Sequence, residues 1–543
     1  MHIPIVAIGR AGEVHSFPTP GHSYSATGIF ASASGCIRIG KISMSLFREV
    51  SPRKHLPIMA LASLLLGLAG CAGFPGKQVT APLAQPDSFQ TGLSLAGAGG
   101  EWPDAGWVKQ FGDAQLVALT EEALAHNPDI QGAQARIAAA QAQADAARGA
   151  SLPSAVALVS VDRSYVSQNI GVPTPAGPSQ PGISWSNTAQ SLIGLNYELD
   201  LWGKNRAALE HAVSQGKAAA AEAQQARLSL SAALASTYNQ LAQQCAARAV
   251  IEQLLQQRQG LGRLTEQRLK AGLDSRIEQS RAGENVADAG NQLAQIDEQI
   301  LLTRHQIGEL LGEGPDRGLS VTEPQLASLP TPPLPDQLPL DLLGRRPDIV
   351  AARWQVEAAE KEIDGAKARF YPDINLSAAV GYASFGLGNL SRSTLKGIEG
   401  GPAITLPIFE GGQLRANLRG EVAEYDQAVA SYNQALNTAL TEVADAIGSI
   451  RAADRQLLTQ TQMLEASRRT YALVGQRHDA GLAATGALLD AQAGVLAAQQ
   501  RQIELESRRR GLQIALIKAL GGGFEAQSAG LALAPAATVA AQP

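Results

Sequence analysis

The sequence predicts a mixed α/β membrane protein built from two tandem repeats that supply four β-strands and long α-helices per chain. Three observations support this fold class: a heptad pattern from Val422 to Tyr471, motifs that recur at a fixed offset, and short segments in which apolar and polar residues alternate. A chain of 543 residues would otherwise suggest about three or four ordinary domains.

The heptad pattern lies in a proline-free run from Leu414 to Leu520. Its apolar positions are Val422, Val429, Leu436, Val443, Ile450, Leu457, Leu464 and Tyr471, with a second line at Tyr425, Tyr432, Ala439, Ala446 and Ala453. A seam of this length predicts a long coiled-coil helix. A plain dimeric coiled coil would also show it, but would not need the strand-like segment PAITLPIF that precedes the run.

Comparison of the chain with itself defines the domain organisation. Pro128-Asp129-Ile130 recurs as Pro347-Asp348-Ile349, an offset of 219, and QRLKAGL (267–273) matches QRHDAGL (476–482), an offset of 209. A Pro/Gly/Ser-rich insertion in the first copy accounts for the change of offset. We therefore expect a first repeat over 106–314, a proline-rich linker over 315–340, a second repeat over 341–521 and a disordered tail over 522–543.

Each repeat reads as helix, strand, loop, strand, long helix, break and helix. In the second copy the apolar residues Ile374, Leu376, Ala378, Val380 and Tyr382 alternate with small or polar ones, and in the first copy Ile193, Leu195, Tyr197 and Leu199 do the same. Period two with one apolar face predicts a strand, and about ten residues is the length that a membrane strand needs. A half-buried hairpin of a soluble protein is the alternative, which the N-terminal signal and the long helices disfavour.

The N-terminal residues predict a targeting signal. Arg53-Lys54 precedes an apolar run from Leu56 to Leu68, and small residues lead into Cys71. The run is shorter than the ~20 residues that span a bilayer, so it fits a cleaved secretory signal. Small residues directly before a cysteine resemble a bacterial lipobox. An ordinary signal peptide with an incidental cysteine is the alternative.

From this resemblance we expect an upstream extension over 1–43, a start at Met44, a lipoprotein signal peptide over 44–70 and a lipid-anchored tether over 71–105. Cys71 would carry diacylglycerol and an N-acyl chain. Ala72 follows it in place of the Asp that, in enteric bacteria, retains lipoproteins at the inner membrane, which favours the outer membrane.

Composition argues against nucleic acid and against catalysis. The net charge is −5, and no basic run is interleaved with aromatic residues. The sequence has no Walker loop, no HExxH and no GxSxG in a strand-turn-helix setting, and its histidines show no metal-ligand spacing. We therefore expect no enzyme, no cofactor and no metal site.

Four strands per chain imply an assembly. A bilayer does not tolerate unpaired strand edges, and four strands cannot close a barrel of useful bore. If the strands span a membrane, several copies of the chain must pool them, so the sequence predicts a homo-oligomer. The long helices, with matched breaks at Ala271-Gly272 and Ala480-Gly481, would form a helical tube continuous with the strands.

The motifs resemble the outer membrane factors of tripartite export systems, which are TolC-like channels, and above all the NodT-type lipoproteins that serve RND-type pumps. The resemblance covers residues 107–521 and rests on WVKQFGDAQL (107–116), YELDLWGKNR (197–206), LPLDLLGRRPDI (338–349), LPIFEGGQLR (406–415) and LLDAQ (488–492). It implies a homotrimer with a twelve-stranded β-barrel in the outer membrane and a periplasmic α-helical barrel. Its partners would be a periplasmic adaptor (membrane fusion) protein and an inner-membrane RND transporter.

The resemblance also suggests site residues. Asp490 matches the Asp ring at the closed periplasmic end, whereas Gly486 stands where a leucine usually forms a hydrophobic ring, so that Leu489 or a neighbouring helix would have to supply that ring. The adaptor would contact the helix-turn tips at Gly272-Leu273 and Gly481-Leu482.

The sequence therefore predicts a gated, passive export conduit for small toxic compounds. An outer-membrane duct for type I protein secretion is one alternative. A periplasm-spanning structural coiled-coil lipoprotein is another, although such a tether has no use for alternating strands.

Overall fold

The structure is a computed structural model that describes residues 82–84, 89–91, 93–95, 100–165, 185–327, 329, 338–385 and 396–532. These residues all belong to one unit, Gly76–Pro543. The predicted upstream extension, the signal peptide and Cys71 lie outside the described residues.

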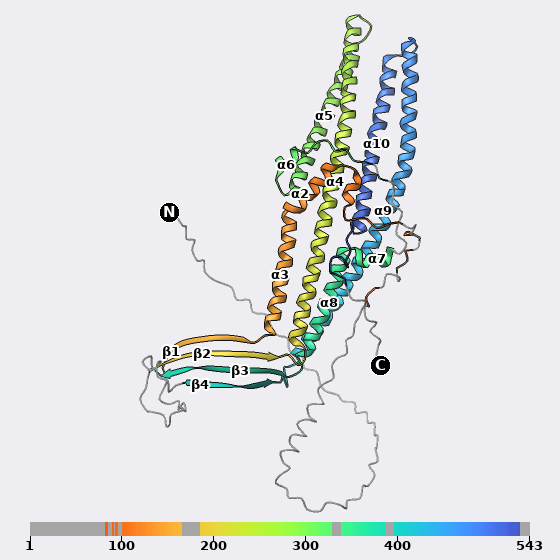
Figure 1. The fold of residues 1–543 in the computed structure, drawn as a ribbon. Coiled ribbons are helices and arrows are strands. Elements are labelled where there is room, and N and C mark those ends of the chain that lie inside the picture. Colours follow the sequence, from red (N-terminus) through yellow and green to blue (C-terminus); the bar gives the residue numbers. More distant parts are fainter. Residues whose placement is uncertain are drawn as a thin grey trace, which may run out of the picture. The chain divides into compact units, whose positions relative to one another are not determined.

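The first repeat begins with a short 3-10 helix and has two α-helices on each side of its β-hairpin (Figure 1). Its elements are η2 (Trp107–Phe111), α2 (Ala114–His126), α3 (Pro128–Ala150), β1 (Ser154–Tyr165), β2 (Trp185–Leu199), α4 (Lys204–Lys270) and α5 (Arg276–Leu311). Asp113 caps α2 and Asn127 caps α3 through side-chain oxygens, as polar residues do at helix starts.

The second repeat follows in the same order. After α6 (Pro315–Leu319) come α7 (Leu338–Arg345), α8 (Pro347–Ala368), β3 (Asp373–Phe385), β4 (Lys396–Thr405), α9 (Gln413–Asp479) and α10 (Thr485–Ala519). Both α4 and α9 have 67 residues, which corresponds to ~100 Å of helix. The two-repeat organisation that the sequence predicted is confirmed by this element order. None of the described helices is long and apolar enough to cross a membrane.

The heptad residues of α9 pack inward, as predicted. Val429, Leu436, Val443 and Ile450 are fully buried, together with Ala439 and Ala453 of the second line. All of these except Ala453 belong to one core with residues of α8 and the end of α10. Figure 1 shows α9 beside α10 and α4 beside α5, so each repeat folds its long helix against the next one. Tyr471, the last heptad residue, is 36% exposed, so the seam opens toward the far end of the helix.

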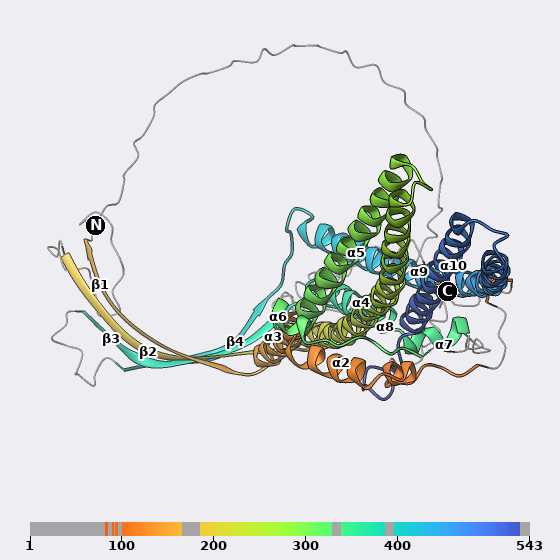
Figure 2. The same ribbon diagram turned by 90° about the horizontal axis from the view of Figure 1, so that it is seen from above.

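The four strands form one antiparallel sheet in the order β1-β2-β3-β4. Ile193 of β2 lies opposite Ala157 of β1 and Val380 of β3, and the register continues without a break along all three pairs. Figure 2 shows that the strands curve together along their length. The sheet therefore joins the two repeats through the β2–β3 pair.

A corresponding hydrogen bond joins two helices in each repeat. Asn127, before α3, donates from Nδ2 to the carbonyl oxygen of Leu310 at 2.9 Å, and Arg346, before α8, donates from Nη1 to that of Ala519 at 3.0 Å. The two pairs correspond at the repeat offsets, 219 for the first residue and 209 for the second. One polar residue thus ties the start of one helix to the end of another in each repeat.

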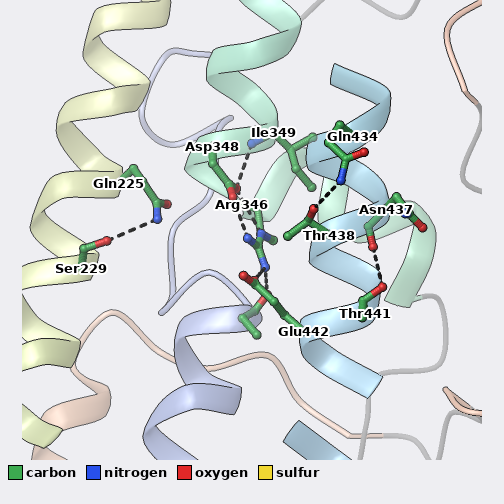
Figure 3. Close-up of polar contacts among 11 residues, drawn as sticks. Gln225, Ser229, Arg346, Asp348, Ile349, Gln434, Asn437, Thr438, Thr441 and Glu442 are labelled. Atoms are coloured by element: carbon green, nitrogen blue, oxygen red, sulfur yellow. Dashed lines mark hydrogen bonds and ion pairs between the residues drawn. The ribbon is translucent and has the colours of Figure 1, made fainter. Parts of the chain in front are cut away.

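Arg346 also holds two carboxylates (Figure 3). Its guanidinium donates to Asp348 at 2.6 and 3.0 Å and to Glu442 of α9 at 2.7 Å, while the side chain is only 6% exposed. Burial alone would lower the pKa of Arg346, but the carboxylates of Asp348 and Glu442 outweigh burial and the pKa lies above its usual value. The guanidinium therefore stays charged inside the second repeat and joins α8, α9 and α10.

The C-terminal segment departs from the prediction. Residues 522–543 were expected to be disordered, but Trp354 of α8 donates from Nε1 to the carbonyl oxygen of Leu531 at 2.9 Å, and Ala526 and Leu531 are buried. Small alanine and glycine residues allow this close approach, which their bare composition did not reveal. Residues 533–543 lie outside the described part.

Parts of the predicted tether and linker also pack on the helices. Asn433 of α9 accepts from the backbone nitrogen of Ala84 at 2.8 Å and donates to the carbonyl oxygen of Pro82 at 3.2 Å. In the linker, the backbone nitrogen of Gln325 donates to Asp113 at 2.9 Å. Both segments are therefore attached to the helices by hydrogen bonds where the structure describes them.

Candidate functional site

The sheet has two chemically different faces, because residues opposite one another in an antiparallel pair share a face. The first, called the apolar face, carries Ala155, Ala157, Val159, Val161, Arg163, Tyr165, Trp185, Asn187, Ala189, Ser191, Ile193, Leu195, Tyr197, Leu199, Ile374, Leu376, Ala378, Val380, Tyr382, Lys396, Ile398, Gly400, Pro402 and Ile404. The second, called the polar face, carries every acidic residue of the strands: Asp162, Glu198, Asp373 and Glu399.

The apolar face is largely uncovered in the single chain. Val159 is 73% exposed, Ile193 54% and Ile398 85%. A contiguous apolar surface of this kind marks an interaction with a membrane or another protein, because water contact costs about 25 cal/mol per Å². The residues at its two ends are aromatic: Tyr165 and Trp185 at one end, and Trp202 and Tyr371 just beyond the other. Aromatic residues at both ends of an apolar band are typical of membrane strands.

Both edges of the sheet are open. Within the described residues β1 pairs only with β2, and β4 pairs only with β3 and is exposed along its whole length. An open edge presents a row of unpaired backbone N–H and C=O groups. The outer edges of β1 and β4 are therefore available to strands of another copy.

A polar and aromatic junction fixes the strands to the helices. Trp202, between β2 and α4, stacks on Tyr371 with ring centroids 4.7 Å apart and donates from Nε1 to the carbonyl oxygen of Pro372 at 2.8 Å. At the start of α4, Lys204 Nζ contacts Glu198 at 2.5 Å and Asp373 at 3.1 Å. The junction thus ties the β2–α4 connection to the α8–β3 connection.

The charge of Lys204 depends on these two partners. Burial lowers the pKa of its ammonium group, but hydrogen bonds to Glu198 and Asp373 outweigh burial, so the pKa lies above its usual value. Lys204 therefore stays charged at neutral pH beside the acidic end of the polar face.

The helix-turn tips have the same structure in both repeats. Gly272 and Gly481 follow the ends of α4 and α9 with φ of 75° and 71°, the left-handed region that glycine enters most easily. The next residue, Leu273 or Leu482, donates its backbone N–H to the carbonyl oxygen five residues earlier at 2.8 or 2.7 Å. The two leucine side chains are 68% and 70% exposed, so each tip presents one apolar side chain to its surroundings.

The three predicted gate residues lie in the first two turns of α10 and do not share one surface. Asp490 is exposed, and a Cβ added to Gly486 would meet nothing within 4 Å. Leu489 instead is 9% exposed and lines a groove with Gln257 and Leu261 of α4. Gln257 donates from Nε2 to the carbonyl oxygen of Leu489 at 3.1 Å. The leucine therefore packs against α4. Asp490 is exposed, and the residue one turn before it, Gly486, has no hydrophobic side chain.

Comparison with known proteins defines the class. The profile of the family "Outer membrane efflux protein" matches residues 119–313 and 338–522, one segment in each repeat. "Fusaric acid resistance protein FusA" of Burkholderia cepacia is 36% identical over 366 residues, 66% of this chain and 68% of its own length. "Multidrug resistance outer membrane protein MdtQ" of Escherichia coli O6:H1 is 32% identical over 484 residues, 86% of this chain and 98% of its own.

A solved structure agrees with these relatives. The outer membrane protein VceC from Vibrio cholerae superposes with a TM-score of 0.70 at 37% identity, over 78% of this chain and 100% of that chain. The chain therefore belongs to the outer membrane efflux protein family. Membership confirms the predicted family and the prediction that the chain is an efflux channel of the outer membrane rather than an enzyme.

Sequence reasoning missed the junction and the separation of charge between the faces. The separation of charge could have been predicted from the alternation, because Glu198 and Asp373 occupy positions in line with the polar residues of the alternating segments. The stacking of Trp202 on Tyr371 joins residues far apart in the chain, and no local pattern announces it.

Proposed function

We propose that this chain is the outer-membrane component of a tripartite, RND-type efflux system and acts as a gated, passive conduit for small toxic compounds. The observation that carries the proposal is the sheet with one apolar face, one acidic polar face and two open edges. A membrane would cover the apolar face, and the polar face would line a water-filled path.

The open edges support a homo-oligomer, and we propose three copies, as the resemblance implies. In lipid each unsatisfied backbone group costs several kcal/mol, so β1 and β4 must pair with strands of other copies. Three copies of four strands give a barrel of about twelve strands, within the range of outer-membrane barrels. The helices α4, α5, α9 and α10 would then form the periplasmic tube, and Cys71 would add a lipid anchor.

The substrate class follows from the names of the relatives. One is a resistance protein for fusaric acid and another a multidrug resistance outer membrane protein. We infer that the cargo is small organic compounds, delivered by an inner-membrane transporter through a periplasmic adaptor. The exposed leucines at Gly272-Leu273 and Gly481-Leu482 would provide apolar contacts for the adaptor.

The gate would be electrostatic. Asp490 lies about 8 Å along α10 from its first residue, close to the tip, and three copies near a common axis would repel one another or bind cations. The Leu489 side chain is buried against α4, and Gly486 has no side chain. The hydrophobic ring would therefore be missing, and Asp490 would form the gate alone.

Single-channel recording in planar lipid bilayers tests both parts of this proposal. The wild-type protein should give discrete but rare openings, and Asp490→Ala should raise the open probability. Asp145→Ala, which removes an exposed carboxylate from α3, is the matched control and should leave it unchanged. Equal opening of wild type and Asp490→Ala would refute the gate, and the absence of conductance from all three proteins would refute the channel.

A further inference from the structure

The charged residues of the strands are sorted by sign between the two faces. Asp162, Glu198, Asp373 and Glu399 lie on the polar face, whereas both cations, Arg163 and Lys396, lie on the apolar face. An exposed cation on a surface that faces lipid is costly unless it reaches polar groups at the membrane boundary. These two cations therefore need a polar or anionic group to bind when the apolar face is in contact with lipid.

Both cations lie at the same end of the sheet. Arg163 is two residues from the end of β1, and Lys396 is the first residue of β4. The loops that follow β1 and precede β4, residues 166–184 and 386–395, contain no Asp or Glu in the sequence. Neither cation forms an ion pair with a carboxylate of the described residues.

Aromatic rings hold each cation without using its N–H donors. The Arg163 guanidinium lies 5.2 Å from the centroid of Trp185, which contacts Tyr165 edge-on at 5.4 Å. Lys396 Nζ lies 5.9 Å from the centroid of Tyr382. A cation over an exposed aromatic ring is fixed in place while its N–H groups stay free to bind an anion. Ring and cation together match a lipid, whose acyl region is apolar and whose headgroup phosphate is anionic.

We propose that Arg163 and Lys396 bind the headgroup phosphates of anionic lipids in the outer leaflet, with Trp185 and Tyr382 packing against the lipid below the phosphate. This inference rests on the proposed function, which puts the apolar face in the membrane and the strand loops on the outer side. The charged strand residues of the polar face are all acids and would repel the same phosphates, so the lipid binds the outside of the sheet.

Native mass spectrometry of the detergent-solubilised protein titrated with lipid tests the proposal. The probes are phosphatidylglycerol, which is anionic, and phosphatidylcholine, which is zwitterionic with the same phosphate linkage. Wild type should bind phosphatidylglycerol in preference. The double variant Arg163→Gln/Lys396→Gln should bind it about 30-fold more weakly, which corresponds to ~1 kcal/mol for each basic residue near a charged membrane surface.

The control double variant, Lys109→Gln/Arg136→Gln, removes two exposed cations from η2 and α3 and should bind as wild type does. Equal binding of the two lipids by wild type, or an unchanged preference in the strand variant, would overturn the proposal. Release of phosphatidylglycerol by millimolar inorganic phosphate would also overturn it, since the site would then bind phosphate rather than lipid.

The same spectra report the subunit count, which separates this inference from the function on which it rests. An oligomer without lipid preference refutes the lipid site alone, and a monomer refutes the membrane assembly. If the double variant does not assemble, Arg163→Gln and Lys396→Gln are tested singly, each with an expected loss of about 5-fold.

Discussion

Replacing Arg346 offers a quantitative test of the repeat structure. The first repeat has Asn127 at the corresponding position, and both residues bind the carbonyl oxygen at the end of the paired helix. Asn127 also caps its own helix, accepting from the backbone nitrogen of Asp129 at 2.8 Å. Arg346→Asn therefore introduces the residue of the first repeat into the second, and Arg346→Ala removes the contact altogether.

The expected losses of stability follow from the contacts. Breaking a buried ion pair costs roughly 3–5 kcal/mol, and the low end of this range, about 3 kcal/mol, applies to Arg346→Ala because Glu442 and Asp348 keep 50% and 31% exposure. In Arg346→Asn, the cap of α8 restores about 1 kcal/mol and the bond to Ala519 about another 1 kcal/mol. A loss of about 1 kcal/mol remains.

The assay is the unfolding rate in urea of the detergent-solubilised protein, followed by the helical circular dichroism signal. If the contacts are broken in the transition state, Arg346→Ala should unfold on the order of 100-fold faster and Arg346→Asn about 5-fold faster. Arg136→Ala, an exposed arginine on α3, serves as control. Equal rates for the Ala and Asn variants would refute the correspondence of the two hydrogen bonds, and a wild-type rate for Arg346→Ala would refute its structural role.

Two further predictions use the same assay. In Gly521→Ala the new Cβ would lie 1.8 Å from the carbonyl oxygen of Arg345, whereas in Gly481→Ala it would meet open space. Gly481→Ala should lose only about 1–2 kcal/mol of stability, because of its left-handed backbone, and Gly521→Ala should lose much more. Equal losses would contradict the close packing of Gly521. The pKa of Lys204 is raised in the folded state, so its stabilising effect is complete below the ordinary lysine pKa of 10.5 and is lost as pH rises beyond it. Wild type should therefore exceed Lys204→Met in stability at pH 7 to 10 and approach it at higher pH, whereas a constant difference would show that Lys204 acts by packing alone.

The long elements could be predicted because their signals are periodic. The heptads of α9 and the alternation in β2 and β3 predicted the right type of element, since one face of each has a distinct environment along its length. The bounds of β3 were close, whereas β2 begins at Trp185, eight residues before the first alternating residue, Ile193. Strand β4 was recognised only at its end, where residues 402–405 begin the strand-like segment PAITLPIF. The preceding residues, KGIEGG, are rich in glycine, and their pairing with β3 is set by tertiary structure.

The structure around the candidate site residues could be predicted only where it depends on a short sequence motif. The tips at Gly272 and Gly481 follow from matched AGL segments, and the structure gives both the same hydrogen bonds. The surroundings of Leu489 could not be predicted, because the groove depends on how α10 crosses α4. For the same reason the sequence does not reveal that residues 522–532 are packed: their burial depends on Trp354, far away in the chain.

The most direct test of the account is the subunit count of the detergent-solubilised mature protein by native mass spectrometry. The open edges of β1 and β4 require partners in the membrane, and we predict a trimer. A stable monomer would leave both edges unpaired in lipid and would contradict the shared barrel on which the proposed channel depends.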